Sequence, residues 1–176
     1  IKGAKAREIP RSRCLPTRFV LTNKDGSNAT LVCKARLVCG GHLDPDVCGL
    51  RTDAPTTDLV SVQLVFFIVA NHKWMLQAGD VSTAFISGVE DVRNLYLYPP
   101  KEGLPGIDPD DRLELLKGVY GLANAPRIWW RRVRQVLRDL GLVEARFLPC
   151  VFLYWETNYK GEKTRLSGIL AIHVDD

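Results

Sequence analysis

The sequence predicts an α+β fold in which helices back a small antiparallel sheet. Apolar residues recur at helical spacing over residues 58–71 and again over 126–140. Near the end of the chain, the apolar segments 150–156 and 164–173 flank a polar turn, so we expect them to pair as antiparallel strands. Hydrophobic residues make up 46% of the 176 residues, which is enough to build the core of one domain.

A β-hairpin is expected near the start of the chain. Thr17 to Leu21 has strand character, Asp25-Gly26 is a turn signal, and residues 29–38 form the expected returning strand. Lys34 and Arg36 are two positions apart, so the period of a strand places them on one face. Such a face either binds an anion or is simply exposed to solvent, and the pattern leaves both readings open.

The segments around the hairpin carry weaker signals. Residues 1–16 show no period and contain two prolines, so we expect a leader or linker. Residues 39–56 are rich in glycine and proline and predict a loop, and Thr57 with Asp58 behind it is the expected cap of the first long helix. The expected core stripe of that helix comprises Leu59, Val62, Val65 or Phe66, and Val69.

Short elements are expected between the two helices. Residues 74–81 predict a strand that brings Asp80 to its C-terminal end, and residues 82–85 predict a short helical turn. Brief strands are expected at 95–98 and 113–116, with a loop between them. The expected core stripe of the second long helix comprises Trp129, Val133, Val136, Leu137 and Leu140.

Positive charge is concentrated at the start of the chain, which suits contact with a polyanion. The basic residues there are Lys2, Lys5, Arg7, Arg11, Arg13, Arg18, Lys24, Lys34 and Arg36, against only Glu8 and Asp25. The five cysteines lack Cys-x-x-Cys spacing and predict neither a disulfide framework nor a zinc site. The longest apolar run, 64–70, is too short to span a membrane, so we expect an intracellular protein without a membrane partner.

Three carboxylates are candidate metal ligands. Asp175 and Asp176 follow the apolar run 169–172, and two adjacent acids beside a buried strand need a cation to neutralise them. Asp80, at another predicted strand end, is the third candidate. Together the three acids suit two Mg²⁺ ions in the arrangement that serves phosphoryl transfer. Taken singly, Asp80 could instead cap a helix, and the terminal pair could lie in a loop.

Six motifs occur in order along the chain. They are Lys-Ala-Arg-Leu-Val (34–38), Gly-Asp-Val-Ser-Thr-Ala-Phe (79–85), Leu-Tyr-Leu-Tyr-Pro-Pro (95–100), Gly-Val-Tyr-Gly-Leu-Ala-Asn-Ala-Pro-Arg-Ile-Trp (118–129), Leu-Pro-Cys-Val-Phe (148–152) and His-Val-Asp-Asp (173–176). This series resembles the reverse transcriptase segment of the Pol polyprotein of Ty1/copia-type retrotransposons. The segment 118–129 points to the copia branch rather than to retroviral or intron-encoded enzymes.

The resemblance implies a right-hand polymerase fold with fingers and a partial palm. It covers about residues 17–176. Fingers are expected over about 17–73 and 87–125, and palm over about 74–86 and 126–176, truncated after the Asp-Asp turn. The family's thumb is expected to be absent, so we expect little or no activity from this segment alone.

The resemblance also implies a role for each candidate residue. Asp80, Asp175 and Asp176 are expected to be catalytic and, with the backbone carbonyl of Val81, to bind two Mg²⁺ ions, with Mn²⁺ as a substitute. The residues expected to bind the dNTP are Lys34, Arg36, Phe85, Tyr120 and Gly121. The residues expected to contact template or primer are Pro126, Arg127 and His173, which stands where the family has Tyr.

Phe85 falls at the family's steric-gate position, where an aromatic ring excludes a ribose 2'-OH. A ring packed under the sheet is the alternative for Phe85, and the residue type alone does not choose between the two.

The implied activity is that of an RNA-directed DNA polymerase, which adds dNTPs to a primer 3'-OH. The implied partners are an RNA or DNA template with its primer and the remaining Pol domains, namely thumb, RNase H and integrase. The implied location is the cytoplasm, including virus-like particles. Two alternatives stay open: a catalytically inactive nucleic-acid-binding relic of such an element, and a two-metal nuclease, which explains the acids but neither Phe85 nor segment 118–129.

Overall fold

The computed structural model describes residues 1–24, 30–88 and 93–173. The α-helices are α1 (Ala4–Arg7), α2 (Leu59–His72) and α3 (Ala125–Asp139). The strands are β1 (Cys14–Leu15), β2 (Thr17–Asn23), β3 (Cys33–Cys39), β4 (Tyr96–Leu97), β5 (Leu113–Glu114), β6 (Val143–Glu144), β7 (Val151–Thr157) and β8 (Lys163–Ala171). Short 3-10 turns are η1 (Arg11–Arg13), η2 (Gly41–Leu43), η3 (Val47–Gly49) and η4 (Ala84–Ser87).

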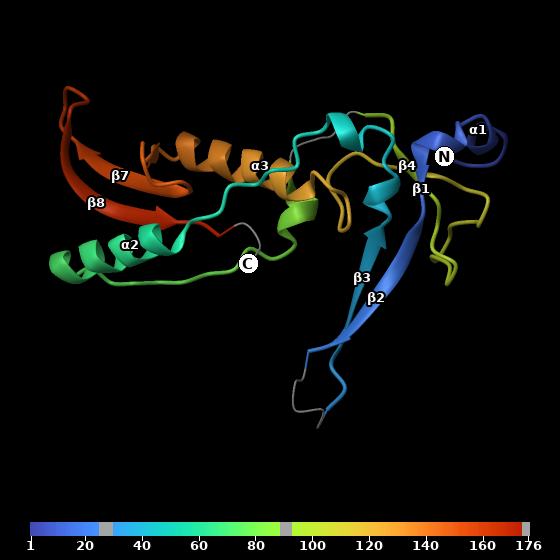
Figure 1. Ribbon diagram of the computed structural model, residues 1–176, viewed down its shortest axis with the longest axis horizontal. Coiled ribbons are helices and arrows are strands. Elements are labelled where there is room, and N and C mark those ends of the chain that lie inside the picture. Colours follow the sequence, from blue (N-terminus) through green and yellow to red (C-terminus); the bar gives the residue numbers. More distant parts are fainter. Residues whose placement is uncertain (25–29, 89–92, 174–176) are drawn as a thin grey trace.

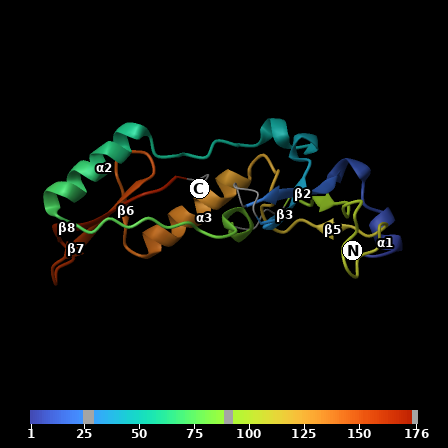
Figure 2. The same cartoon turned by 90° about the horizontal axis from the view of Figure 1, so that it is seen from below.

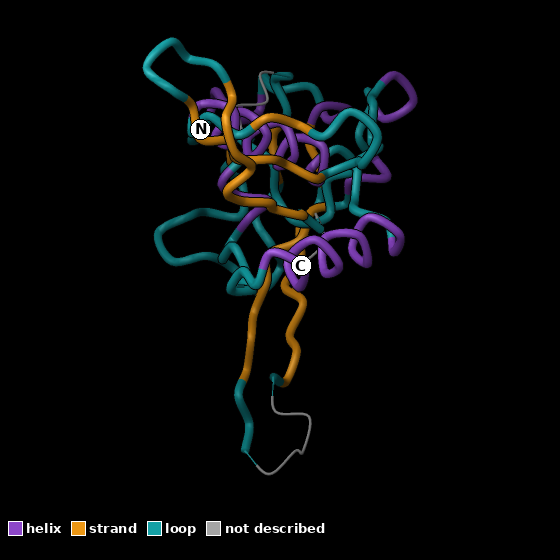
Figure 3. Tube along the Cα trace, turned by 90° about the vertical axis from the view of Figure 1, so that its left-hand side faces the viewer, coloured by secondary structure: helices purple, strands orange, loops and turns teal. Residues whose placement is uncertain are grey.

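The elements of the described residues are strung out along one long axis (Figure 1). The sheet β6-β7-β8 lies at one end beside α2, α3 runs through the middle, and the sheet β1-β4-β5 lies at the other end (Figures 1 and 2). The hairpin β2-β3 projects away from this body (Figure 3). Helices and sheets are therefore mixed as an α+β chain requires, while the fingers-and-palm arrangement stays a prediction. No helix among the described residues combines the length and the hydropathy needed to cross a bilayer.

The start of the chain packs into the fold, although a linker was expected for residues 1–16. Strand β1 pairs in parallel with β4, and β4 pairs antiparallel with β5. Leu15 is fully buried in a cluster with Leu95 and Leu97. Sequence periodicity could not reveal β1, because a strand of two residues is too short to show a period.

Strands β2 and β3 form the predicted antiparallel hairpin, paired along their whole length. The predicted turn at Asp25-Gly26 lies outside the described residues. Lys34 and Arg36 are half-buried, whereas Ala35 between them is exposed, so the predicted alternation is confirmed. The second strand begins at Cys33, later than predicted.

Helix α2 has nearly the predicted bounds but a different buried face. Asp58 is its N-cap, because the Asp58 carboxylate accepts a hydrogen bond from the backbone N–H of Ser61 at 2.6 Å. Ser61 and Val65 are buried, whereas Leu59 from the expected stripe is 71% exposed. The helix is apolar on almost every side, so spacing alone could not select the face that packs on β8.

The strand predicted for residues 74–81 is wrong. Residues 74–80 run without regular secondary structure, and no described strand pairs with them. A strand needs a neighbouring strand to pair with its backbone N–H and C=O groups. An apolar sequence pattern does not show whether such a neighbour exists. The helical turn predicted next is present as η4.

Helix α3 and the sheet β6-β7-β8 share the second core cluster. Trp129 and Leu137 of the predicted stripe pack there with Phe152 of β7, which is fully buried. Val136 and Leu140, also expected in the stripe, are exposed. Strands β7 and β8 pair antiparallel as predicted.

Candidate functional site

A cavity of about 280 Å³ opens between β3, β4, η4 and the segment that precedes α3. Its lining includes Lys34 and Arg36 of β3, Thr83 and Ile86 at η4, and Tyr120. Among the described residues that line it, the charged side chains are two cations, with no carboxylate. The two cations therefore give this largely apolar cavity a positive charge that suits contact with an anionic group.

Arg36 is held at the cavity wall by an aromatic ring. The guanidinium carbon of Arg36 lies 5.8 Å from the centroid of the Tyr120 ring, within reach of a cation–π contact. Lys34 lies on the same face of β3, two residues away. A guanidinium and an ammonium side by side suit the oxygens of a phosphate chain.

Tyr120 is fixed by main-chain contacts with β3. The backbone N–H of Cys39 donates a hydrogen bond to the carbonyl oxygen of Tyr120 at 2.8 Å. Gly121 follows with φ +89°, and a Cβ placed there would lie 2.2 Å from the carbonyl oxygen of Cys39. Only glycine fits this backbone conformation and this close approach together. The motif resemblance implied that Arg36, Tyr120 and Gly121 bind the dNTP; the structure brings Arg36 and Tyr120 to one cavity, while dNTP binding stays a prediction.

Two further features of the wall concern reactivity and shape. Burial raises the pKa of the Cys39 thiol to about 11, so this cavity-lining cysteine stays protonated near neutral pH and is a poor nucleophile or metal ligand. Gly118 lies so close to η4 that a Cβ there would meet the carbonyl oxygen of Phe85 at 2.9 Å.

Phe85 packs beside the cavity. Its ring meets the Tyr120 ring edge-on, with centroids 5.7 Å apart and an interplanar angle of 85°. Phe85 is partly buried and packs against both hydrophobic clusters. It therefore has a core role, while its neighbours Thr83 and Ile86 line the cavity.

The predicted metal ligands are not brought together within the described residues. Asp80 is exposed in the segment before η4 and forms no ion pair with a described residue, and Val81 is 54% exposed. Asp175 and Asp176 lie outside the described residues. Residues 1–24, 30–88 and 93–173 contain no group of three His, Cys, Asp or Glu side chains that could hold a metal ion. The metal site stays a prediction.

The end of β8 nevertheless approaches the region that follows Asp80. Ile172 packs against the same core cluster as Ala84 and Phe85. The carbonyl oxygen of Ile172 accepts a hydrogen bond from the backbone N–H of Thr57 at 3.2 Å. The last described residues thus lie on the side of the molecule where η4 begins (Figure 1).

The residues predicted to contact template or primer lie in two places. Pro126 is in the first turn of α3, and Arg127 beside it pairs with Asp53 at 3.0 Å. The pKa of Asp53 lies below its ordinary value, chiefly because Arg51 donates a hydrogen bond to its carboxylate, with the charge of Arg127 adding to the effect. His173 is exposed after β8.

A buried ion pair escaped the sequence prediction. Arg93 donates a hydrogen bond to Asp44 at 2.7 Å, and the Asp44 side chain is fully buried. The two residues are 49 positions apart in loops without periodicity, so no local signal connects them. The Asp44-Pro45-Asp46 sequence was the only hint, and it is typical of any turn.

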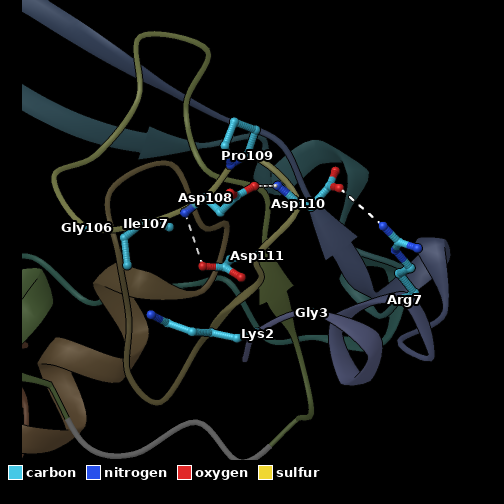
Figure 4. A pocket seen from close by; sticks show the side chains of 9 residues that line it. All are labelled: Lys2, Gly3, Arg7, Gly106, Ile107, Asp108, Pro109, Asp110 and Asp111. Carbon is cyan, nitrogen blue, oxygen red and sulfur yellow. Dashed lines mark hydrogen bonds and ion pairs between the residues drawn. The ribbon is translucent and has the colours of Figure 1, made fainter.

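A second cavity, of about 660 Å³, lies at the start of the chain (Figure 4). Its acids serve their own loop: Asp111 accepts a hydrogen bond from the backbone N–H of Asp108, and Asp108 accepts one from the backbone N–H of Asp110. Arg7 faces Asp110 across 3.6 Å, with both side chains largely exposed. This arrangement is that of a surface turn.

Comparison with known proteins identifies the family. Residues 7–176 match the family model described as reverse transcriptase (RNA-dependent DNA polymerase). The retrovirus-related Pol polyprotein from transposon RE2 of Arabidopsis thaliana is 30% identical over 161 residues, which cover 90% of this chain and 10% of the relative. Its counterpart from transposon RE1 of the same plant is 30% identical over 132 residues, 73% of this chain and 9% of the relative.

The Pol polyprotein from transposon TNT 1-94 of Nicotiana tabacum is 27% identical over 177 residues, 96% of this chain and 12% of the relative. The chain thus spans about a tenth of the length of these relatives. No solved structure matches it significantly. The family match covers most of the chain and confirms the resemblance carried by the six motifs: the chain belongs to the reverse transcriptase (RNA-dependent DNA polymerase) family.

Proposed function

We propose that the chain forms the fingers and part of the palm of an RNA-directed DNA polymerase in a copia-type Pol polyprotein, which adds dNTPs to a primer 3'-OH. The cavity beside β3 carries the proposal, because Lys34 and Arg36 lie in it next to Tyr120. Two cations, with no carboxylate among the described residues that line the cavity, suit a triphosphate, and the aromatic ring suits a nucleoside beside it.

The proposed metal site combines Asp80, the backbone carbonyl of Val81, Asp175 and Asp176. These are hard oxygen donors of the kind that Mg²⁺ prefers, and the exposed Asp80 carboxylate has no competing cation among the described residues. Bound Mg²⁺ would supply charge neutralisation during phosphoryl transfer. The contribution of Lys34 and Arg36 is to hold the triphosphate in one orientation, which reduces the entropic cost of aligning the reacting groups.

Phe85 is the proposed gate against ribonucleotides. Its edge-on contact with Tyr120 fixes the ring next to one wall of the cavity. A rigid ring at that place would leave room for a deoxyribose and exclude a sugar that carries a 2'-OH.

The proposed partners follow from the same assignment. An RNA or DNA template with its primer would run past Pro126, Arg127 and His173. The thumb, RNase H and integrase domains of the polyprotein would complete the enzyme, which we place in the cytoplasm and in virus-like particles.

Primer extension on an RNA template tests the proposal. The assay uses a Pol polyprotein that contains this chain, with Mg²⁺ and dNTPs, beside Asp80→Asn and Arg36→Gln. Loss of a metal ligand should lower kcat by at least about a hundredfold, and loss of the phosphate-binding guanidinium should raise the KM for dNTP about tenfold. Arg165→Gln is the matched control, since Arg165 is 73% exposed in β8 and pairs only with Glu156 among the described residues.

Equal extension by the parent and Asp80→Asn would refute the metal assignment. A parent that binds template and primer but never extends the primer would identify the inactive relic instead.

Ribonucleotide incorporation tests the gate separately. Phe85→Ala should admit more ribonucleotides, because the excluded space opens, whereas Phe67→Ala, on the exposed side of α2 at 65% exposure, should not. If Phe85→Ala admits no more ribonucleotides than the parent, the ring serves only the core.

A further inference from the structure

The ion pair of Arg93 and Asp44 is the buried centre of a polar network. Arg93 Nη1 lies 2.7 Å from Asp44 Oδ2, with the two side chains 15% and 0% exposed. Arg93 Nη2 also donates to Asn124 Oδ1 at 3.3 Å. Asp46 accepts two hydrogen bonds from Arg13, at 2.9 and 3.0 Å, and Arg13 donates to the carbonyl oxygen of Arg93 as well.

This network joins four segments of the chain, the first of which is η1 with Arg13. Asp44 and Asp46 follow η2, which comes directly after β3, and Arg93 precedes β4. Asn124 is the N-cap residue of α3, yet its side chain does not cap the helix and points its oxygen to Arg93. The network therefore ties the turn after β3, at the base of the β2-β3 hairpin, to the start of α3.

Main-chain contacts connect the network to the cavity wall. A Cβ at Gly41 would lie 2.1 Å from the carbonyl oxygen of Gly121 and 2.8 Å from Cα of Leu122, so the two backbones touch without a side chain between them. One residue earlier, Tyr120 accepts the hydrogen bond of the Cys39 N–H. The turn that contains Gly41 therefore lies directly against the segment that carries Tyr120, so a shift of this turn toward that segment would displace Tyr120.

We propose that the Arg93–Asp44 pair is a positioning device that sets the width of the nucleotide cavity by holding Tyr120 against β3. The inference rests on the proposed nucleotide-binding function. Arg93 and Asp44 are positioning residues that do not touch the substrate. A buried ion pair gains little stability, because desolvation offsets its attraction. The pair instead fixes the relative orientation of the segments it joins, since the planar guanidinium of Arg93 donates to Asp44 and Asn124 at once.

Asp44→Asn is the decisive substitution, because it keeps the side-chain volume and removes the charge. In a Pol polyprotein that contains this chain, the KM for dTTP in primer extension and its equilibrium Kd should both rise about tenfold, while kcat at saturating dTTP changes less than about twofold. Hydrogen exchange of the Cys39 amide should become faster, because its bond to Tyr120 loosens. A purely structural role would lower the amount of active enzyme and leave KM and Kd unchanged.

Glu144→Gln is the matched control, since Glu144 pairs with Arg134 at 2.6 Å between β6 and α3 and does not line the cavity. Should Asp44→Asn fail to fold, Asn124→Ala removes one bond of the network and should raise Kd in the same direction by about two- to threefold.

Primer extension tests the proposed polymerase function, whereas the Kd for dTTP and the exchange of the Cys39 amide test the positioning role. A parent protein that does not extend the primer contradicts the proposed polymerase function, while Kd and exchange still report on the network. Unchanged exchange of the Cys39 amide, or a Kd for dTTP that rises no more than in Glu144→Gln, overturns the positioning role whatever the extension assay shows.

Discussion

Gly121→Ala should be among the most damaging single-methyl additions in this chain. The new Cβ would lie 2.2 Å from the carbonyl oxygen of Cys39, more than 1 Å inside ordinary van der Waals contact, which begins near 3.4 Å. A non-glycine residue at φ +89° costs about 1–2 kcal/mol. Overpacking adds about 1–3 kcal/mol, which includes weakening of the Cys39–Tyr120 hydrogen bond as the two backbones separate. We expect a loss of about 3 kcal/mol in the free energy of unfolding.

Two other glycines separate these contributions. Gly103 has φ +82° and no atom within 4 Å of its hypothetical Cβ, so Gly103→Ala should lose only the backbone part, about 1–2 kcal/mol. Gly41 lacks a positive φ but meets Gly121 at 2.1 Å, so Gly41→Ala reports overpacking alone. Urea unfolding followed by circular dichroism measures all three. If Gly121→Ala costs no more than Gly103→Ala, the segment that carries Tyr120 does not lie against β3.

Two further predictions concern the other end of the molecule. Phe152→Ala should lower the free energy of unfolding by about 3–5 kcal/mol, because the ring is fully buried, whereas Tyr154→Ala on the same strand, 47% exposed, should cost less than half as much in the same urea titration. The pKa of Glu144 lies below its ordinary value, chiefly because Arg134 donates a hydrogen bond to it. Its stabilising effect should be fully present above pH 5 and lost as the pH falls through the lowered pKa. The stability difference between parent and Glu144→Gln should therefore shrink as the pH falls below 5, and a constant difference from pH 7 to pH 3 would contradict this.

The elements that the sequence predicted well are those whose signal is local. The alternation of Lys34 and Arg36 along one strand, and the spacing of Trp129 and Leu137 along one helix, each follow from the geometry of a single element. The strand expected before Asp80 failed for the opposite reason, because strand formation depends on a partner that the segment itself does not contain. The buried face of α2 failed because a helix that is apolar all round carries no directional signal.

The candidate site shows the same difference between residues with a local sequence signal and residues whose partners are distant in the chain. Motif resemblance placed Tyr120 and Arg36 at one function, and the structure places them at one cavity wall. It could not reveal Arg93, whose partners Asp44 and Asn124 are 49 and 31 positions away in the chain. Such contacts depend on how three separate segments pack, and neither propensity nor period encodes that packing.

The cavity wall depends on backbone contacts more than on strand pairing. β4 contributes only two paired residues, and the segment with Tyr120 belongs to no strand. The position of the segment that carries Tyr120 is set instead by two close backbone approaches, that of Gly121 to Cys39 and that of Gly41 to Gly121. A methyl group added at either glycine would force these backbones apart. Such contacts are short-ranged and non-directional, so they set how closely the backbones approach but resist separation only weakly. The hydrogen bond from Cys39 to Tyr120 holds the wall directly, and in our proposal the directional Arg93–Asp44 pair keeps the adjoining turn in place, so a change far from the nucleotide should appear as weaker nucleotide binding.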